Sequence, residues 1–114
     1  MSPAAAAASL RARDRARARE AHARAEVLRA LLPQAAATLR ELGAKQIWAF
    51  GSLVNGNVHP GSDMDLAVLG LSGEAWASAL GRLSQLVPAE VDLVRIESAT
   101  PSFADRIRCE GRVL

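Results

Sequence analysis

The most informative segment of the sequence is Phe50-Gly51-Ser52, followed after ten residues by Asp63-Met64-Asp65-Leu66. The apolar run 46–50 and the run 64–69 both have the composition of short strands. Residues 55–62 between them, Asn-Gly-Asn-Val-His-Pro-Gly-Ser, are turn formers throughout. The segment therefore predicts two strands that are joined by a loop.

Three aspartates stand where their charges need an explanation. Asp63 and Asp65 are two positions apart at the start of a predicted strand, so their side chains lie on the same face. Like charges held side by side repel each other unless a cation neutralises them. Asp92 interrupts a further apolar run, 90–96, which we expect to be a third strand. If the two strands are neighbours, three carboxylates meet, and oxygen ligands of this kind suit two Mg²⁺ or Mn²⁺ ions.

Gly51-Ser52 has the chemistry of a phosphate-binding turn. Glycine allows the backbone to approach a ligand closely, free N–H groups at such a turn face an anion, and the serine hydroxyl adds a donor. A polyphosphate site beside a metal site of three carboxylates indicates phosphoryl or nucleotidyl transfer.

The rest of the chain predicts helices between and around these strands. Apolar residues recur at helical spacing from Val27 to Leu42, where Pro33 either starts a new helix or kinks the first one and Gly43 is the expected stop. Further helices are expected over 74–87 and 101–109, with a short last strand at 112–114. Together these elements predict a small α/β domain over residues 31–114.

Residues 1–30 differ in composition from that domain. They hold seven arginines and three acids, a net charge of +4, whereas residues 31–114 have a net charge of −2. We expect residues 1–8 to be disordered, Ser9 to cap a helix, and residues 10–25 to form that helix without an apolar stripe. Three roles stay open for this extension: a solvated helix, an arm that docks on a partner protein, or an arm that contacts RNA.

Composition limits the class of protein further. The chain has 114 residues and 50% hydrophobic content, but 24 residues are alanine, so the core is that of one small domain. One cysteine, Cys109, excludes an internal disulfide and, with two distant histidines, a zinc-type ligand set. Because we find neither a membrane-spanning run nor a secretory leader, we expect a cytoplasmic protein. The mildly acidic domain argues against nucleic acid as the partner.

The motifs resemble those of a known family. Gly51-Ser52, Gly56, Ser62-Asp63-x-Asp65-Leu66 and the Val-Asp-Leu-Val around Asp92 are similar to the minimal nucleotidyltransferase (MNT) branch of the DNA polymerase β-like nucleotidyltransferase superfamily. The likeness runs from about residue 31 to the closing pattern Arg106-Ile-x-x-Glu110-Gly. It implies a mixed sheet with helices packed on one side. It also implies transfer of AMP from ATP to a hydroxyl, with pyrophosphate as the leaving group.

The resemblance also implies roles for individual residues and a partner. Asp63 and Asp65 would bind both metal ions, and Asp92 would hold the metal that activates the acceptor hydroxyl and would accept its proton. Gly51 and Ser52 would bind the β- and γ-phosphates. Many family members are antitoxins that silence a small helical HEPN ribonuclease toxin by AMPylating a tyrosine. We therefore expect a HEPN-type toxin as partner, with which the chain can form an oligomer.

Two positions depart from the family pattern and keep a second hypothesis open. The family often has a basic or aromatic residue directly after Gly-Ser and an arginine two positions later, where this chain has Leu53 and Asn55. Loss of those charges would weaken triphosphate binding, which favours a binding module that neutralises its partner by occlusion alone. An aminoglycoside-type nucleotidyltransferase is disfavoured, because such enzymes carry a further helical domain.

Overall fold

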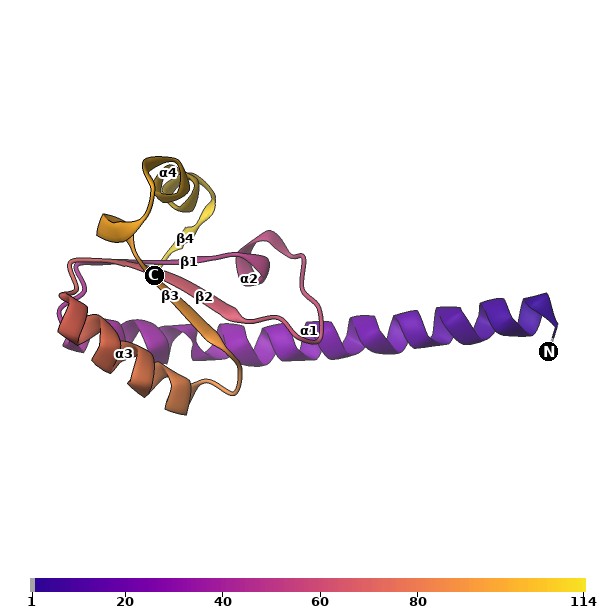
Figure 1. The fold of residues 1–114 in the computed structure, drawn as a ribbon. Coiled ribbons are helices and arrows are strands. Elements are labelled where there is room, and N and C mark those ends of the chain that lie inside the picture. Colours follow the sequence, from indigo (N-terminus) through magenta and orange to yellow (C-terminus); the bar gives the residue numbers. More distant parts are fainter. Residues whose placement is uncertain (1) are drawn as a thin grey trace.

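The computed structural model describes residues 2–114 and has the predicted order of helices and strands (Figure 1). The bounds are α1 Pro3–Glu41, β1 Gln46–Phe50, α2 Ser52–Asn55, β2 Met64–Leu69, α3 Gly73–Leu86, β3 Val91–Arg95, the 3-10 turn η1 Ile96–Ser98, α4 Pro101–Glu110 and β4 Arg112–Val113. The first two strands have the bounds that the sequence predicted. The short α2 follows directly after Gly51 and precedes most of the loop of turn formers.

The four strands form one mixed sheet in the order β3-β2-β1-β4. β1 is antiparallel to both β2 and β4, whereas β2 and β3 are parallel. Parallel strands need a crossover connection, and α3 supplies it between β2 and β3. The α/β class and the mixed sheet are therefore confirmed.

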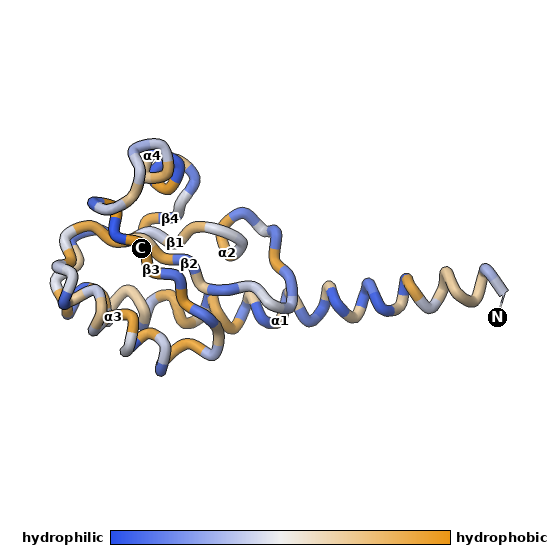
Figure 2. The backbone as a smooth tube through the Cα atoms, viewed as in Figure 1, coloured by the Kyte–Doolittle hydropathy of each residue, from blue (hydrophilic) through white to orange (hydrophobic). Residues whose placement is uncertain are grey.

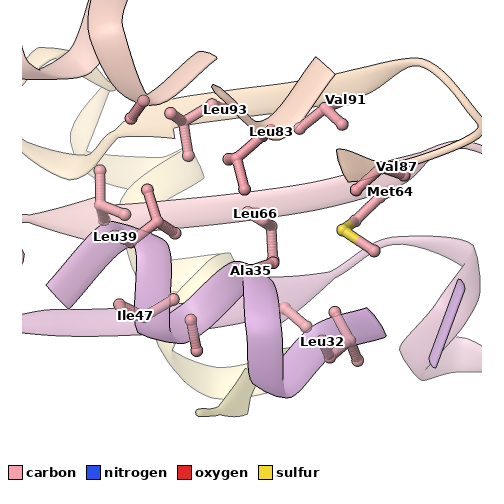
Figure 3. Close-up of a cluster of buried hydrophobic side chains, with 14 of the residues drawn as sticks. Leu32, Ala35, Leu39, Ile47, Met64, Leu66, Leu83, Val87, Val91 and Leu93 are labelled. Atoms are coloured by element: carbon pink, nitrogen blue, oxygen red, sulfur yellow. The ribbon is translucent and has the colours of Figure 1, made fainter. Parts of the chain in front are cut away.

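One face of the sheet packs against α1 and α3 (Figure 1). Its core consists of alternate residues of each strand with the apolar sides of the two helices (Figure 3). Leu39, Leu66 and Leu83, one from α1, one from β2 and one from α3, are each fully buried there. Helix α1 ends as predicted: its last residue is Glu41, and Gly43 has the positive φ of 109° that a glycine stop provides.

The opposite face is covered by α4, so the helices are not all on one side of the sheet (Figure 1). Trp48 of β1 and Ala67 of β2 point to that face, and they are buried against Ala104 and Ile107 of α4. The cause lies in the strands themselves, because β1 and β2 are apolar at consecutive positions and so have two faces to bury. The one-sided packing that the resemblance implied holds for α1 and α3.

Helix α1 begins earlier than predicted. It starts at Pro3, and Ser2 caps it by accepting a hydrogen bond of 3.2 Å from the amide of Ala5. The expectations of disorder over residues 3–8 and of a cap at Ser9 are therefore wrong, whereas Met1 lies outside the described residues. The physical reason is that alanine has the highest helix propensity and proline is favoured at the first helical position.

Helix α1 also continues without interruption across residue 30 and through Pro33. Residues up to Glu20 are mostly exposed and project beyond the sheet, where hydrophilic and weakly hydrophobic residues alternate (Figure 2). From Ala21 onward the helix is seated on the domain, with Ala25 and Leu28 in the main core. Part of the helix that was expected to lack an apolar stripe, residues 10–25, is therefore buried. The small side chains of Ala21 and Ala25 allow α1 to approach the domain closely.

None of the helices formed by residues 2–114 contains a stretch long and apolar enough to cross a membrane.

Candidate active site

The strand register brings Asp65 and Asp92 side by side. Asp65 of β2 is the direct partner of Asp92 in parallel β3 and of Phe50 in antiparallel β1. Asp63 precedes Asp65 by two residues, at the point where β2 begins. The condition stated from the sequence, that the strand of Asp92 must lie beside the strand of Asp65, is met. All three carboxylates belong to the sheet face that α4 covers, because Phe50 in the same row packs edge-on against Phe103 of α4, with ring centroids 5.9 Å apart.

The environment of Asp65 disfavours its negative charge. Partial burial raises the pKa of Asp65 above its ordinary value, and the neighbouring charges of Asp92 and Asp63 raise it further. Asp92 is exposed on β3, which is an edge strand, and Asp63 is half-buried. A cation placed between these carboxylates would relieve the repulsion that raises the pKa.

The donor chemistry fits divalent metal ions, although the carboxylates do not form a closed ligand set. Within residues 2–114, no three acidic, histidine or cysteine side chains are close enough together to hold an ion as they stand. Asp63 and Asp92 would have to turn toward Asp65 to ligate the same ion. Their adjacency and the oxygen-only donors are nevertheless what Mg²⁺ or Mn²⁺ ligation requires.

Gly51 is shaped by its contact with Asp65. Its φ of 72° and ψ of −151° lie in a region essentially confined to glycine. A Cβ atom at this position would lie under 3 Å from Asp65 Oδ2, so only a residue without a side chain fits there. The Gly-Ser turn therefore lies directly against Asp65.

The two departures from the family pattern have structural explanations. Leu53 is 5% exposed and belongs to the core, so the residue after Ser52 points inward, away from any phosphate. Asn55 is exposed, and its Oδ1 accepts a hydrogen bond of 2.8 Å from the amide of Asn57. Neither position supplies a cation to the turn.

A cleft of about 240 Å³ lies next to this turn. Its walls come from the end of β1 with α2, and from α4: Phe50, Gly51, Val54, Asn55, Phe103, Arg106, Ile107 and Glu110. Arg106 is the cationic residue of this lining, and among residues 2–114 it forms one ion pair, a long contact of 4.0 Å with Glu110. The sequence had given Arg106 only as part of the closing pattern, and the structure places it across the cleft from Gly51. The carboxylates adjoin this cleft through Phe50 but are not among its lining residues.

The loop before Asp63 is held by its own hydrogen bonds. The amide of His59 donates to Ser62 Oγ at 2.8 Å, and the amide of Ser62 donates to the His59 carbonyl at 2.9 Å. His59 Nδ1 accepts from the amide of Gly61 at 3.1 Å, so this histidine stabilises the turn.

Comparison with protein families assigns the chain to a family of nucleotidyltransferases. The family model described as polymerase beta, nucleotidyltransferase, matches residues 36–114, which include the whole sheet and all three aspartates. The chain belongs to this nucleotidyltransferase family. The match begins inside α1, at residue 36. No curated protein sequence matches the chain significantly.

Solved structures place this nucleotidyltransferase near the MNT branch. A toxin–antitoxin structure with AMP-PNP is similar at 30% identity and a TM-score of 0.59, covering 67% of this chain and 65% of that chain, which is just under two thirds of its length. A variant of the toxin–antitoxin pair MntA–HpeT is similar at 28% identity and a TM-score of 0.62, covering 72% of this chain and 69% of that one. A complex of a tri-AMPylated Shewanella oneidensis HEPN toxin with its MNT antitoxin has a TM-score of 0.59 at 23% identity, covering 75% and 70%, and this likeness concerns the fold alone.

Proposed function

We propose that this protein transfers AMP from ATP to a hydroxyl of a partner protein. The observation that carries the proposal is the row formed by Asp65 and Asp92 on adjacent strands, with the side-chain-free Gly51 against Asp65. A nucleotidyl transfer needs carboxylates for metal ions next to a turn that accepts a polyphosphate. Membership of the nucleotidyltransferase family supports this chemistry.

In this proposal each residue has a defined task. Asp63 and Asp65 would hold two Mg²⁺ ions, with Mn²⁺ as the alternative, and Asp92 would hold the ion that activates the acceptor hydroxyl. These ions would neutralise charge on the attacking and leaving oxygens. Gly51 and Ser52 bind the β- and γ-phosphates through backbone N–H groups and the hydroxyl.

The reaction then requires one proton transfer from the acceptor. The acceptor oxygen forms a bond to the α-phosphorus while the bond from that phosphorus to the bridging oxygen of the β-phosphate breaks. The hydroxyl proton passes to Asp92, which is exposed and therefore accessible to an acceptor on another protein. Pyrophosphate leaves, and the acceptor carries the AMP.

The partner proposed is a HEPN-type toxin, and the acceptor is one of its tyrosines. The likeness at 30% identity to a toxin–antitoxin structure with AMP-PNP supports both the partner and the nucleotide. In this role the protein acts as an antitoxin by protein adenylylation.

The test uses the full chain co-expressed with a candidate HEPN-type partner protein. Intact-mass spectrometry of that protein should show increments of AMP with the wild-type chain, and none with Asp63→Asn or Asp65→Asn. Glu74→Gln is a matched control, because Glu74 is an exposed acid in the first turn of α3, away from the carboxylate row. Transfer that continues in both aspartate variants would refute the proposal.

A second candidate function is neutralisation of the partner by occlusion. It is favoured by Leu53, which faces the core, and by the open arrangement of the three carboxylates. The variant Asp65→Ala separates the two functions. If co-expressed toxin is still fully neutralised and carries no AMP, occlusion is the mechanism, whereas loss of protection supports AMP transfer.

A further inference from the structure

Two arginines of α1 donate hydrogen bonds to the backbone on either side of the candidate active site. Arg24 Nε donates to the carbonyl of Ser62 at 2.8 Å, and Arg29 Nε donates to the carbonyl of Leu53 at 3.0 Å. Both arginines are half-buried, and both precede residue 36, where the family match begins. They therefore connect the middle of α1 to the two backbone segments that carry the candidate site.

The contact of Arg24 fixes the residue directly before Asp63. Ser62 is 1% exposed, and its hydroxyl and amide are already used within the turn with His59. Its buried carbonyl needs a donor, because an unpaired buried carbonyl is costly. Arg24 supplies a charged donor, and on the other side the amide of Met64 bonds to the Glu90 carbonyl at 3.0 Å. Asp63 thus stands between two anchored residues.

The contact of Arg29 fixes the turn after Gly51. Helix α2 has only four residues, so the carbonyls at its end have no partner within the helix. Arg29 bonds one of these carbonyls and places a positive charge at the negative end of α2. The orientation of α2 determines where the N–H groups of the Gly-Ser turn point.

We propose that Arg24 and Arg29 are positioning residues of this nucleotidyltransferase and that α1 is therefore part of its active-site framework. The inference rests on the proposed function for its catalytic meaning, but not for the hydrogen bonds themselves. Arg24 sets the position of Asp63, and Arg29 sets the position of the phosphate-binding turn. Neither residue contacts the reacting atoms in this scheme.

The arginines can be altered without detaching α1 from the domain. The helix is seated by Ala25, Leu28 and Leu32, all buried in the main core, and by further core residues beyond Pro33. Loss of a guanidinium should therefore loosen the two tethered segments rather than unfold the protein. Each arginine holds a different segment, so each variant is a control for the other.

Two substitutions at each position separate the hydrogen bond from the rest of the side chain. Glutamine carries its Nε2 the same number of bonds from the backbone as arginine carries Nε, so Arg24→Gln and Arg29→Gln keep a donor there. Arg24→Met and Arg29→Met keep a comparable apolar stem and remove the donor. Arg13→Met is the matched control on the same helix, because Arg13 is exposed and makes no recorded side-chain hydrogen bond or ion pair among residues 2–114.

Amide hydrogen exchange of the metal-free full chain measures the positioning directly. We expect Arg24→Met to speed exchange of the Ser62 amide by roughly tenfold or more, and Arg29→Met to do the same for the Gly56 amide, which closes α2 through the Ser52 carbonyl. The amide of Val87 at the end of α3 is the reference for global opening. Both glutamine variants and Arg13→Met should exchange like the wild type.

Three results would overturn the proposal. One is unchanged exchange at Ser62 and Gly56 in the methionine variants. Another is an equal rise at Val87, which would mean a general loss of stability. The third is failure of both glutamine variants to restore protection, since the donor would then not be what matters.

A binding measurement separates this inference from the proposed function. Affinity for AMP-PNP in the presence of Mn²⁺ should fall about tenfold in the methionine variants and stay near the wild-type value in the glutamine variants. If the wild-type chain binds neither probe, the proposed function fails while the exchange result still decides whether the arginines position the loops. If the wild type binds and the methionine variants bind equally well, the positioning role fails.

Discussion

Replacing Gly51 by alanine tests whether the Gly-Ser turn and Asp65 are packed as one unit. The backbone of Gly51 has a φ of 72° and a ψ of −151°, where a residue with a Cβ is strained by about 1–3 kcal/mol. The new methyl group would also collide with the carboxylate of Asp65, and overpacking of this kind costs about 1–3 kcal/mol. The free energy of unfolding should therefore fall by roughly 2–6 kcal/mol in Gly51→Ala.

Gly56→Ala is the matched control for backbone strain. Gly56 also has a positive φ, 85°, but a Cβ there would meet no atom within 4 Å. Its substitution should cost only about 1–2 kcal/mol. The difference between the two variants contains the contact with Asp65 together with the greater backbone strain at Gly51, and the double-mutant cycle below separates the two.

Urea denaturation at pH 7 without metal measures both variants. A double-mutant cycle with Asp65→Ala adds a second test, because it removes the oxygen and carbon atoms that the new methyl would meet most closely. The coupling between positions 51 and 65 should be about 1 kcal/mol or more. The reasoning is refuted if Gly51→Ala is no more destabilising than Gly56→Ala, or if the cycle shows no coupling.

The remaining predictions concern charge at the site. Asp65→Asn should stabilise the metal-free protein at pH 7. In the folded state the pKa of Asp65 is raised above 3.8, so the stability that its protonated form contributes to the wild type is lost as the pH rises through that raised pKa. Urea denaturation at pH 3 and pH 7 should therefore show an advantage of the variant only at pH 7. Mg²⁺ or Mn²⁺ should raise the thermal midpoint of the wild type, EDTA should reverse the rise, and Asp65→Asn should lack it; equal shifts in both proteins would exclude Asp65 as a ligand. Asn55→Arg should tighten AMP-PNP binding by about tenfold in calorimetry, because a charge-assisted contact contributes about 1.5–3 kcal/mol and loss of the Asn55 turn offsets part of it; an unchanged affinity would mean that position 55 does not face the phosphates.

The sequence was sufficient for the elements whose local signals agree with their surroundings. The strands at 46–50 and 64–69 were predicted residue for residue, because glycines and other turn formers flank both strands. The adjacency of Asp65 and Asp92 could be stated only as a condition. Strand order depends on how the α3 crossover packs, and a pattern of single strands does not contain that information.

The errors arose where local and tertiary effects combine. Residues 3–8 were expected to be disordered because alanine gives no core-forming stripe, yet their helix propensity extends a helix that is anchored further along. The roles of Arg24 and Arg29 had no sequence signal, because arginines on a helix surface look alike until the loops they reach are known. The position of Arg106 in the cleft could not be predicted for the same reason, because the residues that face it come from β1 and α2.

Because Asp92 lies on the outermost strand, the site itself can discriminate little between acceptors. β3 is paired on one side only, and the carboxylate of Asp92 is exposed. In the proposed reaction, an acceptor hydroxyl that reaches Asp92 need not enter an enclosed chamber, so the size of the molecule that carries the hydroxyl is not restricted. A folded protein can present it as readily as a small molecule can. Discrimination among acceptors must then come from surfaces outside the carboxylate row, and the chemistry and the choice of substrate are properties of different parts of the molecule.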